Sequence, residues 1–330
     1  MEKWKSLVKK LVERRGNFTV KKVLKVAGIV LVVMFLAVVG YGFYIYHSIS
    51  NTSERMHEPI EGREISEKRD KEVDMEEQDP MAFLIAGVDS RGDNHRGRSD
   101  TIIVMTVNPK EESVKMLSIP RDTRTEIIGK GFQDKINHAY AFGGVEMTIN
   151  TVENFLNIPI DHYASINMEG FKGLVDAIGG VHVDNSFSFN QDGMHFAEGE
   201  LFLNGEEALA YSRMRYEDPR GDFGRNDRQR EIVEAVIKEG ASFSSITSAG
   251  KILDAVGGSV RTDMDLNRMW AIQSNYRNAA KSVEQMEITG SGTRIDGIYY
   301  LAIPDEERNR VIQELRAHLE LDNQETASTQ

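Results

Sequence analysis

Aspartates and arginines stand at the ends of three short apolar runs in the first half of the chain. The runs are MAFLIAGVD (81–89), TIIVMTVN (101–108) and SVKMLSIP (113–120), and each is typical of a buried strand. Short connections favour an antiparallel meander, in which the first strand ends where the second begins and the third returns to the same end. The polar residues at these ends would then share one edge of the sheet: Asp89, Arg91, Arg98, Asp100, Arg121 and Asp122.

Such an edge has a chemical use. Two neighbouring aspartates both stay ionised at low cost only when a cation joins them. Mg²⁺ favours carboxylates, water and substrate phosphates, and planar guanidinium groups pair bidentately with phosphate oxygens. The edge therefore predicts a site where Mg²⁺ (or Mn²⁺) and arginines hold a diphosphate, as phosphoryl transfer requires. Aspartate and arginine are also ordinary turn and ion-pair residues, so a structural role stays open for each one taken singly.

A second concentration of arginines lies in YSRMRYEDPRGDFGRNDRQR (211–230), which contains no lysine although the chain has a formal net charge of −12. One interpretation is a solvated helix face with ion pairs, for which helical spacing fits Asp227 with Arg230. The other is a site that binds an anion. A solvated face normally includes lysine, so the composition favours the anion site. The arginines concerned are Arg213, Arg215, Arg220, Arg225, Arg228 and Arg230.

Composition limits the chemistry further. The 330 residues include no cysteine, which excludes disulfides, thiolate metal sites and cysteine nucleophiles. The part after residue 46 is strongly acidic, which argues against a nucleic-acid partner, because such a partner needs a basic surface. Four of the eight histidines, at 138, 162, 182 and 195, show no metal-ligand spacing. They are interpreted as structural or as lying near the group that accepts the transferred phosphoryl.

The N-terminus predicts a membrane anchor. Residues 26–46 form an uncharged apolar run long enough to cross a bilayer as a helix, with tyrosines at its outer end. Nine basic residues precede it against only Glu2 and Glu13, so residues 1–25 should be a cytoplasmic tail and everything after Tyr46 extracellular. A cleaved signal peptide would have a shorter apolar region and a small-residue cleavage site, which is not found here.

The remaining organisation follows from the same patterns. We expect an acidic, solvated stalk over 47–79, one catalytic domain over 80–322 and a flexible tail over 323–330. Interleaved strands and helices predict an α/β fold, an α/β/α sandwich around a mixed central sheet, preceded by the one transmembrane helix. Further strands are expected at 162–167 and 181–184, and helices at 145–157, 169–178, 205–214, 226–239 (with Asn226 as its N-cap), 265–280 and 305–320.

Five segments in order carry a family resemblance. GVDSRGDNHRGRSDTIIV, LSIPRDT, KINHAYAFGG, LNGEEALAYSRMR and DFGRNDRQR resemble the LytR–CpsA–Psr proteins of Gram-positive cell envelopes, over about residues 80–240. The resemblance is strongest to the wall teichoic acid ligases of that family. It implies an α/β sandwich with a hydrophobic tunnel for a lipid tail. It also implies transfer of a glycopolymer from a polyisoprenyl diphosphate lipid to the muramic acid 6-hydroxyl of peptidoglycan, which forms a phosphodiester and releases polyisoprenyl phosphate.

The resemblance also assigns residues. The aspartates that match Asp89 and Asp100 serve the Mg²⁺ site, and Lys135 and Asn137 match a further family motif. Gln229 matches the glutamine of the R-x-x-R-Q helix. The arginines that contact the diphosphate or support its surroundings match Arg98, Arg121, Arg213, Arg215 and Arg225, and Arg91 lies in the same charged edge.

No nucleotide is needed for this reaction, because the diphosphate already stores the driving force. Arg121 would stabilise charge on the leaving phosphate, and Asp89 or Asp122 would accept the proton of the muramic hydroxyl; the sequence does not rank these two. The competing interpretation is a lipid diphosphate hydrolase that uses the same site with water as the acceptor. A transcriptional regulator is disfavoured by the predicted topology, since only about 25 residues would lie in the cytoplasm.

Overall fold

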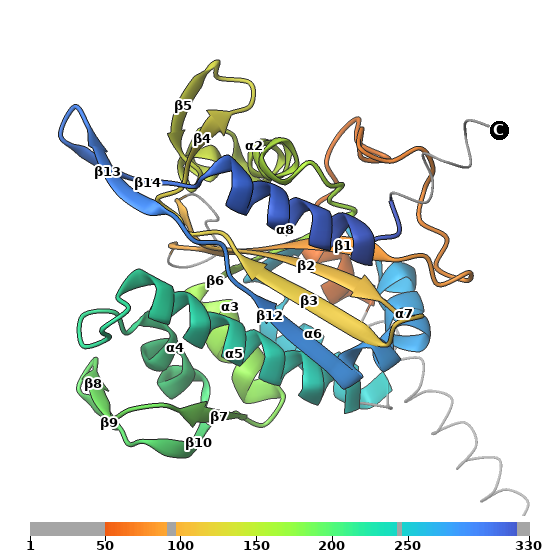
Figure 1. The fold of residues 1–330 in the computed structure, drawn as a ribbon. Coiled ribbons are helices and arrows are strands. Elements are labelled where there is room, and N and C mark those ends of the chain that lie inside the picture. The colour runs from red at the N-terminus through yellow and green to blue at the C-terminus, as the bar shows by residue number, and fades with distance from the viewer. Residues whose placement is uncertain (1–49, 91–96, 243–245, 322–330) are drawn as a thin grey trace, which may run out of the picture. The chain divides into compact units, whose positions relative to one another are not determined.

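A mixed six-stranded sheet lies at the centre of the fold in the computed structural model, which describes residues 50–90, 97–242 and 246–321 (Figure 1). The first three strands pair as the predicted antiparallel meander. Two further strands join in parallel, β6 beside β1 and β12 beside β3. In spatial order the strands are β11 (Val260–Thr262), β6 (His162–Asn167), β1 (Met81–Val88), β2 (Ser99–Asn108), β3 (Ser113–Ser118) and β12 (Ser282–Met286).

Helices cover both faces of this sheet, which confirms the predicted α/β class with a mixed central sheet. Successive side chains of a strand point to opposite faces. Accordingly, Leu84 of β1 packs in the core under α2 (His138–Leu156) and α8 (Asp305–His318), whereas Phe83 packs on the other face. That second face is covered by α5 (Asp222–Ser242), α7 (Leu266–Asn275) and the 3₁₀ helix η1 (Arg277–Lys281), with α3 (Met168–Ala177) and α6 (Ile246–Val256) packed together near β6.

A smaller group of elements forms its own apolar core beside α5. It contains the strand expected at 181–184, but this strand pairs outside the central sheet, in a two-stranded sheet with β10. The helix that follows β10 begins with a capping box between Asn204 and Glu207. The elements are β7 (Val181–Asn185), β8 (Phe189–Gln191), β9 (Met194–Phe196), β10 (Gly199–Leu203) and α4 (Gly205–Arg213).

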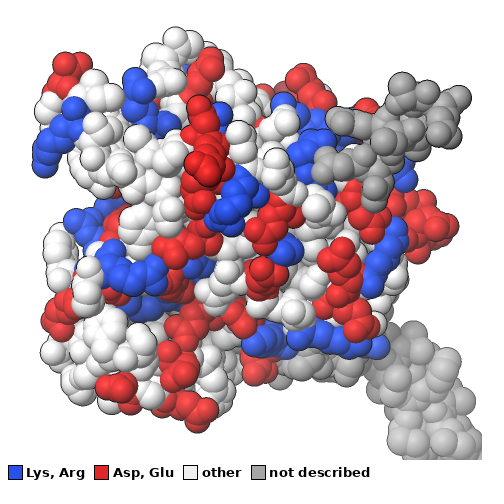
Figure 2. Space-filling model, in the orientation of Figure 1, with Lys and Arg blue, Asp and Glu red and all other residues white. Residues whose placement is uncertain are grey.

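Two hairpins lie near the end of the sheet at which β3 terminates. The first consists of β4 (Arg124–Ile127) and β5 (Phe132–Lys135), the second of β13 (Ser291–Ile295) and β14 (Ile298–Ala302). They are linked to each other through a bridge between Thr123 and Leu301. In Figure 2, basic side chains gather between the β13–β14 hairpin and the start of α5, with acidic side chains among them.

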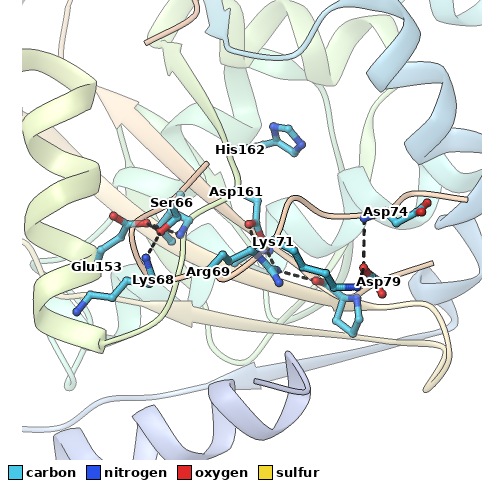
Figure 3. Close-up of polar contacts among 12 residues, drawn as sticks. Ser66, Lys68, Arg69, Lys71, Asp74, Asp79, Glu153, Asp161 and His162 are labelled. Carbon is cyan, nitrogen blue, oxygen red and sulfur yellow. Dashed lines mark hydrogen bonds and ion pairs between the residues drawn. The ribbon is translucent and has the colours of Figure 1, made fainter. Parts of the chain in front are cut away.

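Residues 51–79, which we call the N-terminal strap, pack against the domain (Figure 3). Arg69 donates from Nε and Nη2 to the carboxylate of Asp161, with 2.8 Å from Nη2 to Oδ2, and the side chains are only 4% and 7% exposed. Arg63 pairs with Glu153 at 2.6 Å, and Ser66 donates to the same carboxylate.

The strap therefore differs from the solvated stalk predicted over 47–79. Its charged residues suggested solvation, but two of them, Arg63 and Arg69, form largely buried ion pairs with carboxylates 90 and 92 residues away. Of the residues described, none belongs to a helix long and apolar enough to cross a membrane. The predicted anchor at 26–46, the cytoplasmic tail at 1–25 and the C-terminal tail at 323–330 lie outside the described residues.

Replacing Arg69 with Ala should destabilise the domain strongly. The change leaves the Asp161 carboxylate buried without its cation, and breaking a buried pair in this way typically costs about 3–5 kcal/mol. Chemical denaturation of the protein measures this loss. Lys68→Ala is the matched control, because Lys68 makes an exposed contact with Asn157 and should change the free energy of unfolding by less than about 0.5 kcal/mol. A strap that were a solvated stalk would give the same small effect for both variants.

Candidate active site

Asp100 is the extra residue of a β-bulge. Gly87 of β1 pairs with Thr101, but the next residue, Val88, pairs with Ser99, so Asp100 has no partner position on β1. A bulge of this kind turns a side chain away from the regular alternation of the strand. The Asp100 carboxylate thereby contacts two groups from elsewhere, accepting from Asn137 Nδ2 at 3.2 Å and pairing with Arg121 Nη1 at 3.1 Å.

Asp89 is held close to Arg98 by a glycine. Its backbone N–H donates to the carbonyl of Arg98 at 3.0 Å, which closes the end of the β1–β2 pair. A Cβ on Gly97 would lie 2.6 Å from the carbonyl oxygen of Asp89, closer than two such atoms approach. Because any other residue at position 97 would clash with Asp89, Gly97 allows the end of β1 and the start of β2 to lie this close together.

These strand ends open into a cavity of about 370 Å³. The convergence predicted from the meander is therefore present for five of the six residues at the strand ends, and Arg91 lies outside the described residues. The start of α2 and the end of β5 add three further side chains. The lining residues are Asp89, Arg98, Asp100, Arg121, Asp122, Lys135, Asn137 and His138.

Lys135 neutralises one of the aspartates. Its Nζ lies 2.5 Å from Asp122 Oδ1, while the Nε of Arg121 lies 3.9 Å from the other oxygen. The backbone of Asp122 is also fixed, because its carbonyl accepts from the N–H of Leu301 in β14 at 2.8 Å. Asp122 is thus a carboxylate bound by cations at the base of the two hairpins.

Arg121 is the cation shared by the carboxylates of the cavity. Burial lowers the pKa of Arg121, but the carboxylates of Asp100, Asp222 and Asp122 outweigh burial and raise that pKa above its ordinary value. The guanidinium is therefore permanently charged, and the three carboxylates around it hold it in the cavity at the end of the sheet.

The first turn of α5 joins the arginine-rich segment to this cavity. Asp222 Oδ2 lies 4.0 Å from Arg121 Nε and 2.9 Å from Arg225 Nη2, and its other oxygen lies 3.7 Å from Arg215. Asp222 is a site residue that sequence reasoning missed. The available signal was its position three residues before Arg225 in a helix that begins at Asp222, four residues earlier than predicted. Asn226 consequently lies buried inside α5 and is not its N-cap.

Arg225 has an unused donor. The residue is only 8% exposed, and its Nε is buried without a hydrogen-bond partner among the described residues. Burial lowers the pKa of Arg225, and repulsion from Arg121 and Arg215 opposes the attraction of Asp222 and Asp100. A buried donor without a partner is costly, and an anion bound beside it would satisfy it.

The remaining predicted residues lie farther from these contacts. Arg213 pairs at 3.3 Å with Asp192, in the turn between β8 and β9, and both side chains are exposed. Gln229 lies half-buried on α5, one turn after Arg225. Through Asp222, the structure thus links Arg215 and Arg225 to Arg121 of the cavity lining, but it shows no such link for Arg213.

Three arginines of the same segment are structural. Arg228 pairs with Asp218 at 2.6 Å, with both side chains buried. Arg220 and Arg230 both contact Asp227, as the helical spacing of Asp227 and Arg230 predicts. Ion pairing therefore accounts for Arg220, Arg228 and Arg230, although Arg228 and Arg230 are buried and do not lie on the predicted solvated face. Anion binding by the other arginines of the segment stays a prediction.

The cavity suits a hard divalent cation. A cluster of three or more side chains able to ligate a metal is not found in the described part of the chain. Mg²⁺, however, commonly uses one or two carboxylates and completes its coordination with water and substrate phosphates. Asp89 and Asp100 line the same cavity and supply that number of carboxylates.

Comparison with known proteins extends the match well beyond these residues. The LytR–CpsA–Psr family model matches residues 43–317. A protein of Halalkalibacterium halodurans named polyisoprenyl-teichoic acid–peptidoglycan teichoic acid transferase TagU is 67% identical over 302 residues, covering 91% of this chain and 99% of the relative. The crystal structure of Bacillus subtilis TagU is 49% identical, with a TM-score of 0.60 and coverage of 73% and 97% of the two chains.

A further solved relative carries a ligand. It is the LytR-CPS2A-psr family protein YwtF (TagT) with bound octaprenyl pyrophosphate lipid, 31% identical with a TM-score of 0.64, covering 80% of this chain and 99% of that one. Sequence, fold and the ordered motifs agree in one assignment. The chain belongs to the LytR–CpsA–Psr family.

Proposed function

We propose that this chain is a phosphotransferase that moves an anionic glycopolymer, wall teichoic acid, from a polyisoprenyl diphosphate carrier to peptidoglycan. The transfer forms a phosphodiester with the muramic acid 6-hydroxyl and releases polyisoprenyl phosphate. The names of the relatives at 67% and 50% identity support this activity, and the octaprenyl pyrophosphate bound by a relative supports the class of donor.

One observation in this chain carries the proposal. The buried Nε of Arg225 lacks a partner within the described residues, and Asp222 links Arg225 to Arg121, which lines the cavity. On a chain with a net charge of −12, this is a local concentration of positive charge that a diphosphate would neutralise.

The arginines in and beside the cavity would act in two ways. Arg98 and Arg121, which line it, and Arg225, which Asp222 holds near Arg121, bind the diphosphate. Arg215 supports them through Asp222. The same guanidinium groups stabilise the charge that grows on the leaving polyisoprenyl phosphate, and they need little rearrangement because carboxylates already hold them in place. No nucleotide is required, and neither a nucleotide nor a nucleic acid is an expected partner.

Asp89 and Asp100 are the residues that would hold Mg²⁺ or Mn²⁺. The cation would supply charge neutralisation at the diphosphate. Asp100 is presented for this role by the bulge in β2, and Asn137 and Arg121 fix its carboxylate.

The predicted anchor at 26–46 completes the proposal. It would hold the domain on the outer side of the cell membrane as a single-pass protein with a cytoplasmic N-terminus. The donor lipid lies in that membrane and peptidoglycan lies outside it, so both substrates would be within reach of a tethered enzyme. The lipid tunnel implied by the family resemblance remains part of this proposal.

An acceptor-dependent assay tests the function. Purified protein, lipid-linked teichoic acid donor, Mg²⁺ and peptidoglycan oligomers should give a product in which polymer and glycan are joined, detected by mass spectrometry. Release of polyisoprenyl phosphate should increase when the oligomers are added. Equal release with and without oligomers, and no joined product, would instead identify a diphosphate hydrolase.

Arg121→Ala and Asp100→Ala should each abolish polymer attachment while leaving the fold intact. Removing a charged donor from a site that stabilises developing charge commonly costs about 10²–10³ in rate, and Arg121 is also the cation that the three carboxylates share. Circular dichroism and thermal unfolding check the fold. Arg277→Ala, an exposed change on η1, is the control and should keep the wild-type rate. Wild-type attachment by either site variant would contradict the assignment.

Removal of divalent cations should stop transfer, and added Mg²⁺ or Mn²⁺ should restore it. Calorimetric titration of Mg²⁺ into the protein with a non-transferable lipid diphosphate provides a readout independent of turnover. Asp100→Asn should weaken that binding by about tenfold or more, since it replaces an anionic ligand with a neutral one. Unchanged Mg²⁺ affinity in Asp100→Asn would remove Asp100 from the metal site.

A further inference from the structure

His138 lines the same cavity as Asp89, Arg121 and Asp122. It is the first residue of α2, and its Nδ1 lies 2.7 Å from Asp134 Oδ2 in β5. The sequence pattern gave this histidine no metal-ligand spacing, and the structure instead places it in a His–carboxylate pair. In such a pair the carboxylate orients the ring and sets its tautomer.

Asp134 is held as an ionised acceptor. Its Oδ1 accepts from the backbone N–H of Lys135 at 2.8 Å and from the Tyr300 hydroxyl of β14 at 3.3 Å. Burial raises the pKa of Asp134, but the hydrogen bonds from His138, Lys135 and Tyr300 outweigh burial and bring the pKa below its ordinary value. An ionised carboxylate only accepts, so the neutral His138 ring carries its proton on Nδ1 and a lone pair on Nε2.

The ring of His138 is also fixed by packing. Phe142, one turn later in α2, contacts it edge-on with 5.9 Å between ring centroids. With Nδ1 taken by Asp134, the nitrogen left for the cavity is Nε2, and it has no hydrogen-bond partner in the part of the chain that the structure describes.

Two aspartates of the cavity, Asp122 and Asp100, already have side-chain partners. Asp122 is bound by Lys135 at 2.5 Å, and Asp100 by Arg121 and Asn137. Both carboxylates thus already accept from neighbouring side chains, whereas the Nε2 of His138 has no partner among the described residues. His138 can take a proton on Nε2 while keeping its bond to Asp134.

We infer that His138 is the general base of the transfer, with Asp134 and Tyr300 as positioning residues. The inference rests on the proposed function and deepens it. As the acceptor hydroxyl oxygen bonds to the phosphorus that carries the glycopolymer, its proton passes to Nε2. The bond between that phosphorus and the bridging oxygen breaks, and its electron pair leaves with polyisoprenyl phosphate. The imidazolium then returns the proton to solvent.

Steady-state transfer to peptidoglycan oligomers, with binding of a non-transferable lipid diphosphate measured separately, tests this role. His138→Gln and His138→Ala should lower kcat by about 10²–10³ and leave donor affinity within about twofold, as loss of a general base predicts. Added imidazole should restore part of the rate in His138→Ala, where it has room, but not in His138→Gln.

Asp134→Asn should lower kcat by about tenfold or more, since the ring loses the partner that fixes its tautomer. Tyr300→Phe should have a smaller effect in the same direction.

His195→Gln is the matched control, because His195 is exposed on β9 and contacts Asn190. It should keep the wild-type rate. Transfer by His138→Ala at more than half the wild-type rate would overturn the assignment and favour Asp122 or Asp89 as the base. Loss of donor binding without rescue by imidazole would also overturn it, by indicating a structural role. A wild-type protein that binds donor but never joins it to the oligomers would refute the proposed function itself.

Discussion

The candidate site depends on a chain of alternating charges that crosses from the sheet to a helix. Asp100 pairs with Arg121, Arg121 approaches Asp222, and Asp222 binds Arg225. Each guanidinium is brought close to another of the same charge, and this proximity is tolerated because a carboxylate stands between them. The arrangement brings charged groups from three separate segments together on an otherwise acidic chain, and among the described residues the buried Nε of Arg225 has no hydrogen-bond partner.

Two hairpins connect this chain of alternating charges to the side of the cavity that His138 lines. Asp122 is bound through its backbone to β14 and through its side chain to Lys135 of β5. Tyr300 of β14 and Asp134 of β5 meet over the same junction and hold His138. Under the proposed function, the end of the sheet would supply diphosphate-binding arginines from the residue before β2, from the segment after β3 and from α5. The proton-accepting group would come from α2 and be positioned by β5, so the two roles would depend on different elements.

The sequence predicts the part of the fold that is encoded locally. Apolar runs bounded by Gly and Pro mark β1, β2 and β3, and their short connections suffice to predict the meander and the meeting of Asp89, Asp100 and Arg121. Strand β13, with the sequence SGTRI at 291–295, is exposed or half-buried throughout and carries no alternating apolar pattern. The edge strand β11 has only three residues, too few for a periodic signal.

Long-range polar contacts are what the sequence does not reveal. The pair Arg69–Asp161 spans 92 residues and the bond from Tyr300 to Asp134 spans 166, so neither partner indicates the other. This is why residues 51–79 resemble a solvated stalk and why His138 resembles a structural histidine. Asp222 is an intermediate case, because its helical spacing to Arg225 is visible but its approach to Arg121 is not.

The bulge at Asp100 separates the carboxylate in the cavity from the strand pairing that supports the core. Because Asp100 occupies no rung of the β1–β2 ladder, a chain that lost this residue would have a regular ladder from Met81 to Val88. Such a deletion would remove a carboxylate from the cavity and leave the hydrophobic core under β1 and β2 intact. The carboxylate at this position is therefore independent of the pairing that holds the two strands together.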